Sequence, residues 1–209
     1  MKTTLALTTV LAALFCVTLT LSPSKAQAYP EPAIVSTSWV IDVKFEKPTA
    51  IAVKDRFGVN RWYWYLPYRA INNTSSDRIL SPEFTIATDS GKIIQAGKNV
   101  PLSVYRAIEK QLNNPLLLSP LEIVDKILQG DDYAKESVAI WPAFDHDVDE
   151  FSVFVAGLSG ESATVKNVLT GDDVLLRRTI MLTYNTPGNN INALQDQPVI
   201  LKTRRDVMR

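Results

Sequence analysis

Cysteine and histidine are almost absent from this chain, which has one of each in 209 residues. Cys16 lies in an N-terminal apolar stretch, so a chain processed behind that stretch has no thiol at all. Such a chain forms no disulfide and offers neither a cysteine nucleophile nor a thiolate ligand for structural zinc. A serine–histidine–acid triad or a multi-histidine metal site would have to use His146.

An excess of charge of one sign is also lacking, because 22 Lys and Arg residues balance 22 Asp and Glu residues. Proteins that bind nucleic acid usually carry a basic stripe, so we expect no nucleic-acid partner. The chain does end on a short basic run. We expect a solvated strand or tail there, with contact to an anionic surface as the alternative, and its residues are Lys202, Arg204, Arg205 and Arg209.

Residues 1–28 have the features of a secretory signal peptide. Lys2 precedes an apolar run over Leu5–Leu21, and Ala26–Ala28 is a small-x-small cleavage site. Cleavage would begin the mature protein near Tyr29, and its location would be periplasmic or extracellular. The apolar run is close to the ~20 residues that cross a bilayer, so an uncleaved anchor is the alternative. After cleavage we expect no integral membrane span.

The rest of the chain is predicted to be one all-β domain, 38–209, behind an exposed leader at 29–37. Short runs in which apolar and polar residues alternate are separated by turn signals, and Val104–Leu112 has helical spacing. We therefore predict an immunoglobulin-like β-sandwich with a short helical insertion in the middle of the chain. The predicted strands are Trp39–Phe45, Thr49–Val53, Arg61–Asn72, Phe84–Thr88, Ser137–Ala143, Phe151–Gly157, Ser162–Val168, Val174–Tyr184 and Val199–Lys202.

The strand with the most aromatic residues offers a candidate contact surface. Trp62 and Trp64 fall on one of its faces and Tyr65 on the other, which predicts a central strand covered on both sides. If one face is open instead, it forms a contact surface for a ligand or partner. The residues of that surface would be Trp62, Trp64, Tyr65 and Tyr68. Pro67 has no N–H for the ladder, so we expect a bulge or a local sheet edge there.

A run of alternating carboxylates offers a candidate metal site. Asp145, Asp147 and Asp149 resemble the first half of a calcium-binding loop. The helix–loop–helix version needs glycine at position six and glutamate at position twelve, where this chain has Glu150 and Ala156. A looser calcium site between two strands is one hypothesis, and a charged hairpin tip without metal is the other. We expect no other cofactor.

Two patterns of hydrolases are incomplete or uninformative here. The sequence around Ser159 resembles a nucleophile elbow, but Glu161 stands where the second glycine is required. Carboxylates for sugar hydrolysis are available, yet their separation is a property of space rather than of sequence. Those carboxylates are Glu83, Asp89, Glu122, Asp125 and Glu161.

Several segments together resemble an uncharacterised family of exported bacterial proteins. Trp62–Thr74 is a tyrosine-rich strand with an Asn-Asn-Thr turn, and Pro82–Phe84 is a Pro-Glu-Phe motif. The shorter matches are Thr88–Gly91, Val138–Trp141, Gly157–Glu161 and Val207–Arg209. The chain resembles immunoglobulin-like envelope domains more distantly. The resemblance implies a sandwich fold and an exported location, and it implies no reaction and no catalytic residues.

These observations favour an exported, non-enzymatic protein that acts by surface contact in the cell envelope or outside the cell. Its partner would be a protein or glycan of the envelope. The first alternative is a calcium-assisted carbohydrate-binding module, and the second is a hydrolase.

Overall fold

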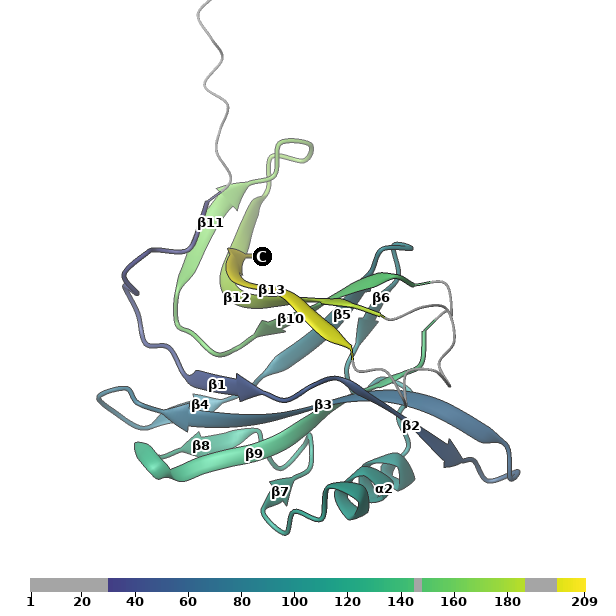
Figure 1. Cartoon of the computed structure of the whole chain (residues 1–209). Coiled ribbons are helices and arrows are strands. Elements are labelled where there is room, and N and C mark those ends of the chain that lie inside the picture. Colours follow the sequence, from purple (N-terminus) through teal and green to yellow (C-terminus); the bar gives the residue numbers. More distant parts are fainter. Residues whose placement is uncertain (1–29, 145–147, 187–198) are drawn as a thin grey trace, which may run out of the picture. The chain divides into compact units, whose positions relative to one another are not determined.

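A computed structural model describes residues 30–144, 148–186 and 199–209. The chain divides into two units, Met1–Pro30 and Glu31–Arg209, and the fold below is that of the second unit. Two β-sheets pack face to face in this unit, and a short helix covers the outer side of the first sheet (Figure 1).

The first sheet is built around β3 (Asn60–Asn72), the aromatic strand. β9 (Gly130–Pro142) pairs in antiparallel register along most of one edge of β3. β1 (Asp42–Phe45) and β2 (Thr49–Lys54) share the other edge, one after the other. β7 (Leu117–Leu118) adds a short parallel strand to β9. β3 is therefore the central strand of this sheet.

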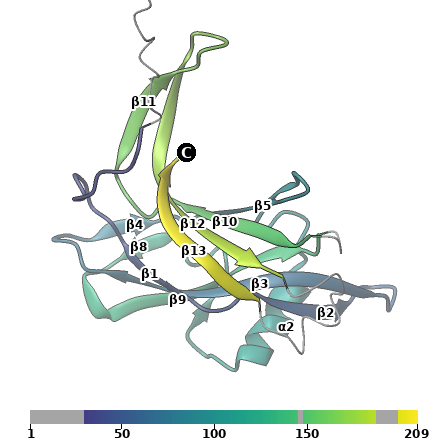
Figure 2. The same ribbon diagram turned by 45° about the horizontal axis from the view of Figure 1, so that its top comes forward.

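The second sheet has six strands and is built around β12 (Asp173–Asn185). The other strands are β5 (Glu83–Thr88), β6 (Ile93–Gln95), β10 (Glu150–Ala156), β11 (Ser162–Lys166) and β13 (Ile200–Met208). One half of β12 lies between β10 and β13. The other half pairs with β11, and this two-stranded arm rises from the side of the sheet that faces away from the first sheet (Figures 1 and 2).

Two smaller elements complete the described fold. β4 (Arg78–Leu80) and β8 (Asp125–Ile127) form a two-stranded sheet. The helix α2 (Leu102–Leu112) is amphipathic, and its buried side chains are Val104, Tyr105 and Ile108. These side chains pack with Tyr63 and Tyr65 on the outer face of the first sheet. The helix ends where Asn113 adopts a left-handed conformation, with φ of 47°.

The main core lies between the two sheets. Phe151 of β10 stands at its centre, with its ring centroid 5.7 Å from that of Trp64 and 5.4 Å from that of Tyr184. These rings come from both sheets, and each fully buried Phe, Leu or Ile side chain contributes about 1.5–3 kcal/mol to stability. The aromatic contacts therefore hold the two sheets together.

This architecture confirms the prediction of an all-β sandwich with a short helix in the middle of the chain. The immunoglobulin-like topology stays a prediction. Within residues 30–144, 148–186 and 199–209, no helix has the length and apolar character needed to cross a bilayer. The predicted signal peptide lies outside the described residues.

Candidate functional site

The aromatic strand does not present the contact surface that one of our predictions placed on it. Trp64 and Tyr68 face the core between the sheets, and Tyr65 faces α2; each is at most 4% exposed. Trp62 is half-buried and packs against the main core. Both faces of β3 are covered because the second sheet lies on one and the helix on the other. These residues are therefore part of the core, as the alternative prediction for the aromatic run has it.

The first sheet is broken along one edge of β3, and the break coincides with Pro67. β1 ends opposite Tyr68, and β2 begins opposite Tyr65. Between them, the amide of Glu46 donates a hydrogen bond of 2.9 Å to the carbonyl of Pro67. Pro67 has no N–H to donate to a neighbouring strand, so interrupting the strand pairing at this position sacrifices few backbone hydrogen bonds. The local sheet edge expected at Pro67 is thus confirmed.

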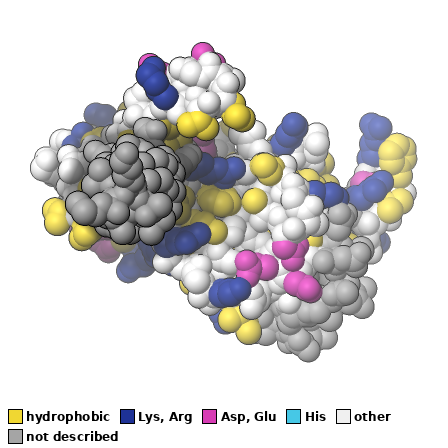
Figure 3. All heavy atoms as spheres, turned by 90° about the horizontal axis from the view of Figure 1, so that it is seen from above, with side chains coloured by type: hydrophobic (Ala, Val, Ile, Leu, Met, Phe, Trp, Pro, Cys, Tyr) yellow, Lys and Arg dark blue, Asp and Glu magenta, His cyan; other side chains and the backbone are white. Residues whose placement is uncertain are grey.

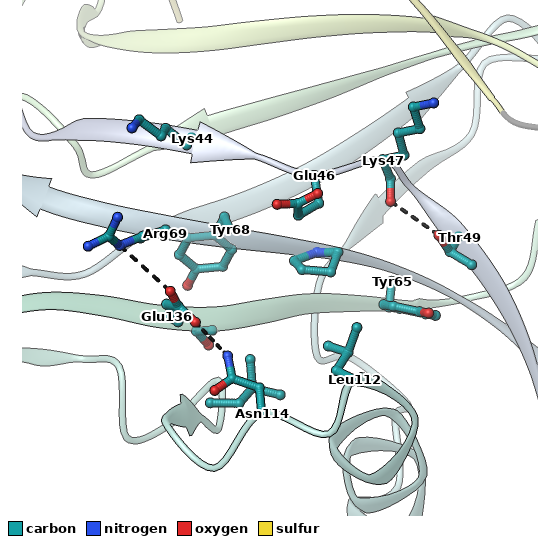
Figure 4. Close-up of a pocket in the computed structure, with 13 residues that line it drawn as sticks. Lys44, Glu46, Lys47, Thr49, Tyr65, Tyr68, Arg69, Leu112, Asn114 and Glu136 are labelled. Carbon is teal, nitrogen blue, oxygen red and sulfur yellow. Dashed lines mark hydrogen bonds and ion pairs between the residues drawn. The ribbon is translucent and has the colours of Figure 1, made fainter.

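A cavity of about 610 Å³ opens at this break, and we call it the strand-break cavity (Figure 4). It lies between the link from β1 to β2 and the link from α2 to β7. Its volume is within the range of about 300–1,000 Å³ that is common for ligand pockets. Its lining residues are Lys44, Glu46, Lys47, Thr49, Tyr65, Pro67, Tyr68, Arg69, Leu112, Asn114, Leu117, Glu136 and Ser137.

Three charged side chains form a row across the strands at one end of the cavity. Arg69 of β3 lies opposite Lys44 of β1 and opposite Glu136 of β9. Its Nε is 3.6 Å from Oε1 of Glu136, whose Oε2 accepts a 2.5 Å hydrogen bond from Asn114 (Figure 4). Like charges directly opposite each other in a sheet destabilise it. Lys44 therefore adds a like charge opposite Arg69, although Asp131, whose Oδ2 is 3.2 Å from Nη2 of Arg69, and Glu136 offset part of the repulsion.

The wall of the cavity formed by β1 and the β1–β2 link carries unpartnered charges. Lys44, Glu46 and Lys47 are exposed, and in the part of the chain that the structure describes their charged groups make no ion pair or hydrogen bond. These groups are available to a ligand without breaking an existing contact.

The opposite wall and the floor of the cavity are mostly apolar. Pro67, Leu112 and Leu117 contribute apolar surface, and Tyr65 accepts a 3.2 Å hydrogen bond from Gln111 at its hydroxyl. Burial raises the pKa of the Tyr65 phenol. The phenol is therefore uncharged at neutral pH and acts as part of the wall.

Among the described residues, two carboxylates line the cavity, Glu46 and Glu136. Glu136 has both carboxylate oxygens engaged, one by Arg69 and the other by Asn114. The carboxylates considered for sugar hydrolysis do not line the cavity: Glu83, Asp89, Glu122, Asp125 and Glu161. Ser159 lies elsewhere, and its Oγ accepts a 3.1 Å hydrogen bond from the amide of Glu161.

The candidate calcium ligands fall largely outside the described residues. Asp145, His146 and Asp147 are not described, and the amide of Asp149 donates a 3.0 Å hydrogen bond to Oδ2 of Asp89. Among the residues that are described, no group of three or more His, Cys, Asp or Glu side chains is placed to hold a metal ion. The calcium site stays a prediction.

Comparisons with protein-family models, curated proteins and solved structures find no match to this chain. The candidate site therefore depends on its own geometry. Sequence reasoning missed Lys44, Arg69 and Glu136, because cross-strand register brings them together. The signal that pointed to this region was Pro67 inside a long strand.

Proposed function

We propose that this chain is an exported, non-enzymatic protein that acts by surface contact in the cell envelope or outside the cell, and that its partner binds in the strand-break cavity. The observation that carries the proposal is the placement of Lys44 opposite Arg69, at the rim of the cavity. An acidic residue at position 44 would stabilise the sheet more. Residues that cost stability are typical of functional sites.

The chemistry of the cavity favours an extended peptide segment that carries an acidic side chain. The apolar floor suits an apolar side chain of the peptide, and Lys44 and Lys47 suit a carboxylate that lies away from Glu46. A neutral sugar commonly stacks on an open aromatic face, and Tyr65 is only 3% exposed. We therefore propose a protein partner for this cavity.

Fluorescence anisotropy with a library of labelled peptides, in which the position of one acidic residue varies, tests the cavity. We expect acidic peptides to bind the purified protein and the neutral versions to bind more weakly. Lys44→Glu and Lys47→Glu should each weaken binding by about tenfold, since each replaces an attraction with a repulsion. Lys98→Glu is the matched control, because Lys98 is an exposed lysine outside the cavity lining.

Two results would contradict the proposal. One is that no acidic peptide binds above the level of its neutral version. The other is that Lys98→Glu weakens binding as much as Lys44→Glu does. The export hypothesis has a separate test, in which N-terminal sequencing of protein recovered from outside the cytoplasm should give a chain that begins near Tyr29.

A further inference from the structure

The outer face of the second sheet is concave where β12 leaves the sheet and enters the arm. Ile180 and Leu182 point into the core, so Arg177, Thr179 and Met181 lie on the outer face. The arm rises on that same side (Figure 2). A hollow of about 410 Å³ lies in the corner between them, and all of its lining residues belong to the second sheet and the residue that follows β13. We call this corner the concave face.

Arginines gather on the concave face. Arg177 and Arg209 exchange two backbone hydrogen bonds, of 2.7 and 3.0 Å, so their side chains leave the sheet side by side. Arg205 lies outside the hollow, opposite Met181 and four residues from Arg209 along the same edge. Four residues of extended strand place it roughly 13 Å away, on the same face. Figure 3 looks onto this side of the molecule and shows basic side chains beside the base of the arm.

Little negative charge balances these arginines. Among the described residues that line the hollow, Glu83 is the only acidic one, and its Oε1 is 3.9 Å from Nη1 of Arg177. Both side chains are more than half exposed, so water weakens this contact. Arg209 lies over the ring of Phe154, with its Cζ 4.1 Å from the centroid, which holds its guanidinium at the surface. The face therefore suits an anionic occupant.

We propose that the concave face binds an acidic polysaccharide, with Arg177 and Arg209 on one carboxylate or sulfate group and Arg205 on another group along the polymer. Two cationic positions roughly 13 Å apart fit a polymer better than a single small anion. Thr85 lines the hollow beside the arginines, and its hydroxyl is a partner for a sugar hydroxyl. Thr179 is only 2% exposed and its hydroxyl donates a 3.0 Å hydrogen bond to the carbonyl of Arg177, so it shapes the floor of the hollow. A flat bilayer does not reach into a concave corner. This site is separate from the strand-break cavity and does not depend on it.

Calorimetric titration of the purified protein with alginate oligosaccharides of graded length tests the proposal, with neutral dextran oligosaccharides of the same lengths beside them. We expect alginate to bind and dextran not to bind, and oligomers that span both arginine positions to bind more tightly than a single uronate. Added salt should weaken the binding. The double variant Arg177→Gln with Arg209→Gln should lose about tenfold or more in affinity, because it removes two charge-assisted contacts.

Arg56→Gln is the matched control, because Arg56 also lies over an aromatic ring, that of Phe57, with its Cζ 4.7 Å from the centroid, at another place in the fold. We expect its affinity to equal that of the wild type. The proposal is overturned if alginate does not bind, if dextran binds equally well, or if the double variant retains full affinity. Tighter binding to single-stranded DNA or to anionic vesicles than to alginate would also overturn it.

Discussion

Replacing Arg178 with methionine tests how much the ion pairs of this residue stabilise the second sheet. Arg178 of β12 donates to Asp206 of β13 at 2.8 Å and to Oε2 of Glu161 at 3.0 Å. Oε1 of Glu161 in turn accepts a 2.7 Å hydrogen bond from the amide of Ala33, which precedes β1. One guanidinium therefore links the two strands to the β10–β11 connection and, through Glu161, to the N-terminal segment.

The expected cost of Arg178→Met follows from burial. Glu161 is 9% exposed and Asp206 is 31% exposed, so Glu161 keeps a poorly solvated charge after the change, whereas Asp206 recovers water. Hydrogen bonds to charged groups contribute about 1.5–3 kcal/mol, and we expect a loss of about 2 kcal/mol in the free energy of unfolding. For a domain of this size the melting temperature should fall by about 4–8 °C.

Thermal unfolding followed by circular dichroism gives the measurement, and Arg177→Met is the control. Arg177 is the next residue, its side chain is 56% exposed, and it lies on the opposite face of the strand. We expect this control to change stability by no more than about 0.5 kcal/mol. Equal melting temperatures for Arg178→Met and Arg177→Met would refute the reasoning.

The same cluster predicts a dependence on pH. The Ala33 amide, together with Arg178, lowers the pKa of Glu161 in the folded state. A lowered pKa means that the stabilisation is present above the unfolded-state pKa of about 4.3 and is lost as pH falls through the folded-state value. The wild type should therefore have a higher melting temperature than Glu161→Gln. The difference between the two should be largest at neutral pH and should become smaller in acid. A difference that stays constant from pH 7 to strong acid would contradict this assignment.

Three further outcomes are expected. Lys44→Glu should raise the free energy of unfolding by about 0.2–1 kcal/mol in denaturant titrations, because it places an acid opposite Arg69; a loss of stability would count against the cross-strand repulsion. In the same titrations, Gly157→Ala should lower the free energy of unfolding clearly more than Gly58→Ala. Both glycines have φ near +80°, which costs about 1–2 kcal/mol for alanine. Only at Gly157 would the new Cβ also lie 2.0 Å from the carbonyl oxygen of Ser81. Millimolar calcium should leave the melting temperature unchanged, and a rise that Asp147→Asn abolishes would instead support the calcium site.

The strands that alternate most regularly were predictable because their pattern follows from burial on one or both faces. β3 and β12 were located to within one or two residues of their observed bounds. The first half of β9 was missed because Gly130–Glu136 is mostly charged and polar, and it is a strand through its pairing with β3. β13 was predicted to end at Lys202, although it continues to Met208. Its basic residues mark an edge strand, which natural sheets protect with charge.

The candidate site was less predictable than the fold. The aromatic pattern correctly indicated that β3 is covered on both faces, and Pro67 indicated an interruption. The cavity itself depends on two strands that share one edge of β3 and on the link that follows α2. Those arrangements are long-range, and no local pattern encodes them. The row of Lys44, Arg69 and Glu136 likewise depends on register across three strands.

The most direct test of the central claim is to map, by nuclear magnetic resonance, which backbone amides respond to the tightest-binding acidic peptide. The account predicts that the largest chemical-shift changes occur along the β1–β2 link and at Arg69 and Glu136, on the walls of the strand-break cavity. Changes confined to other surfaces, with these amides unmoved at saturating peptide, would contradict it.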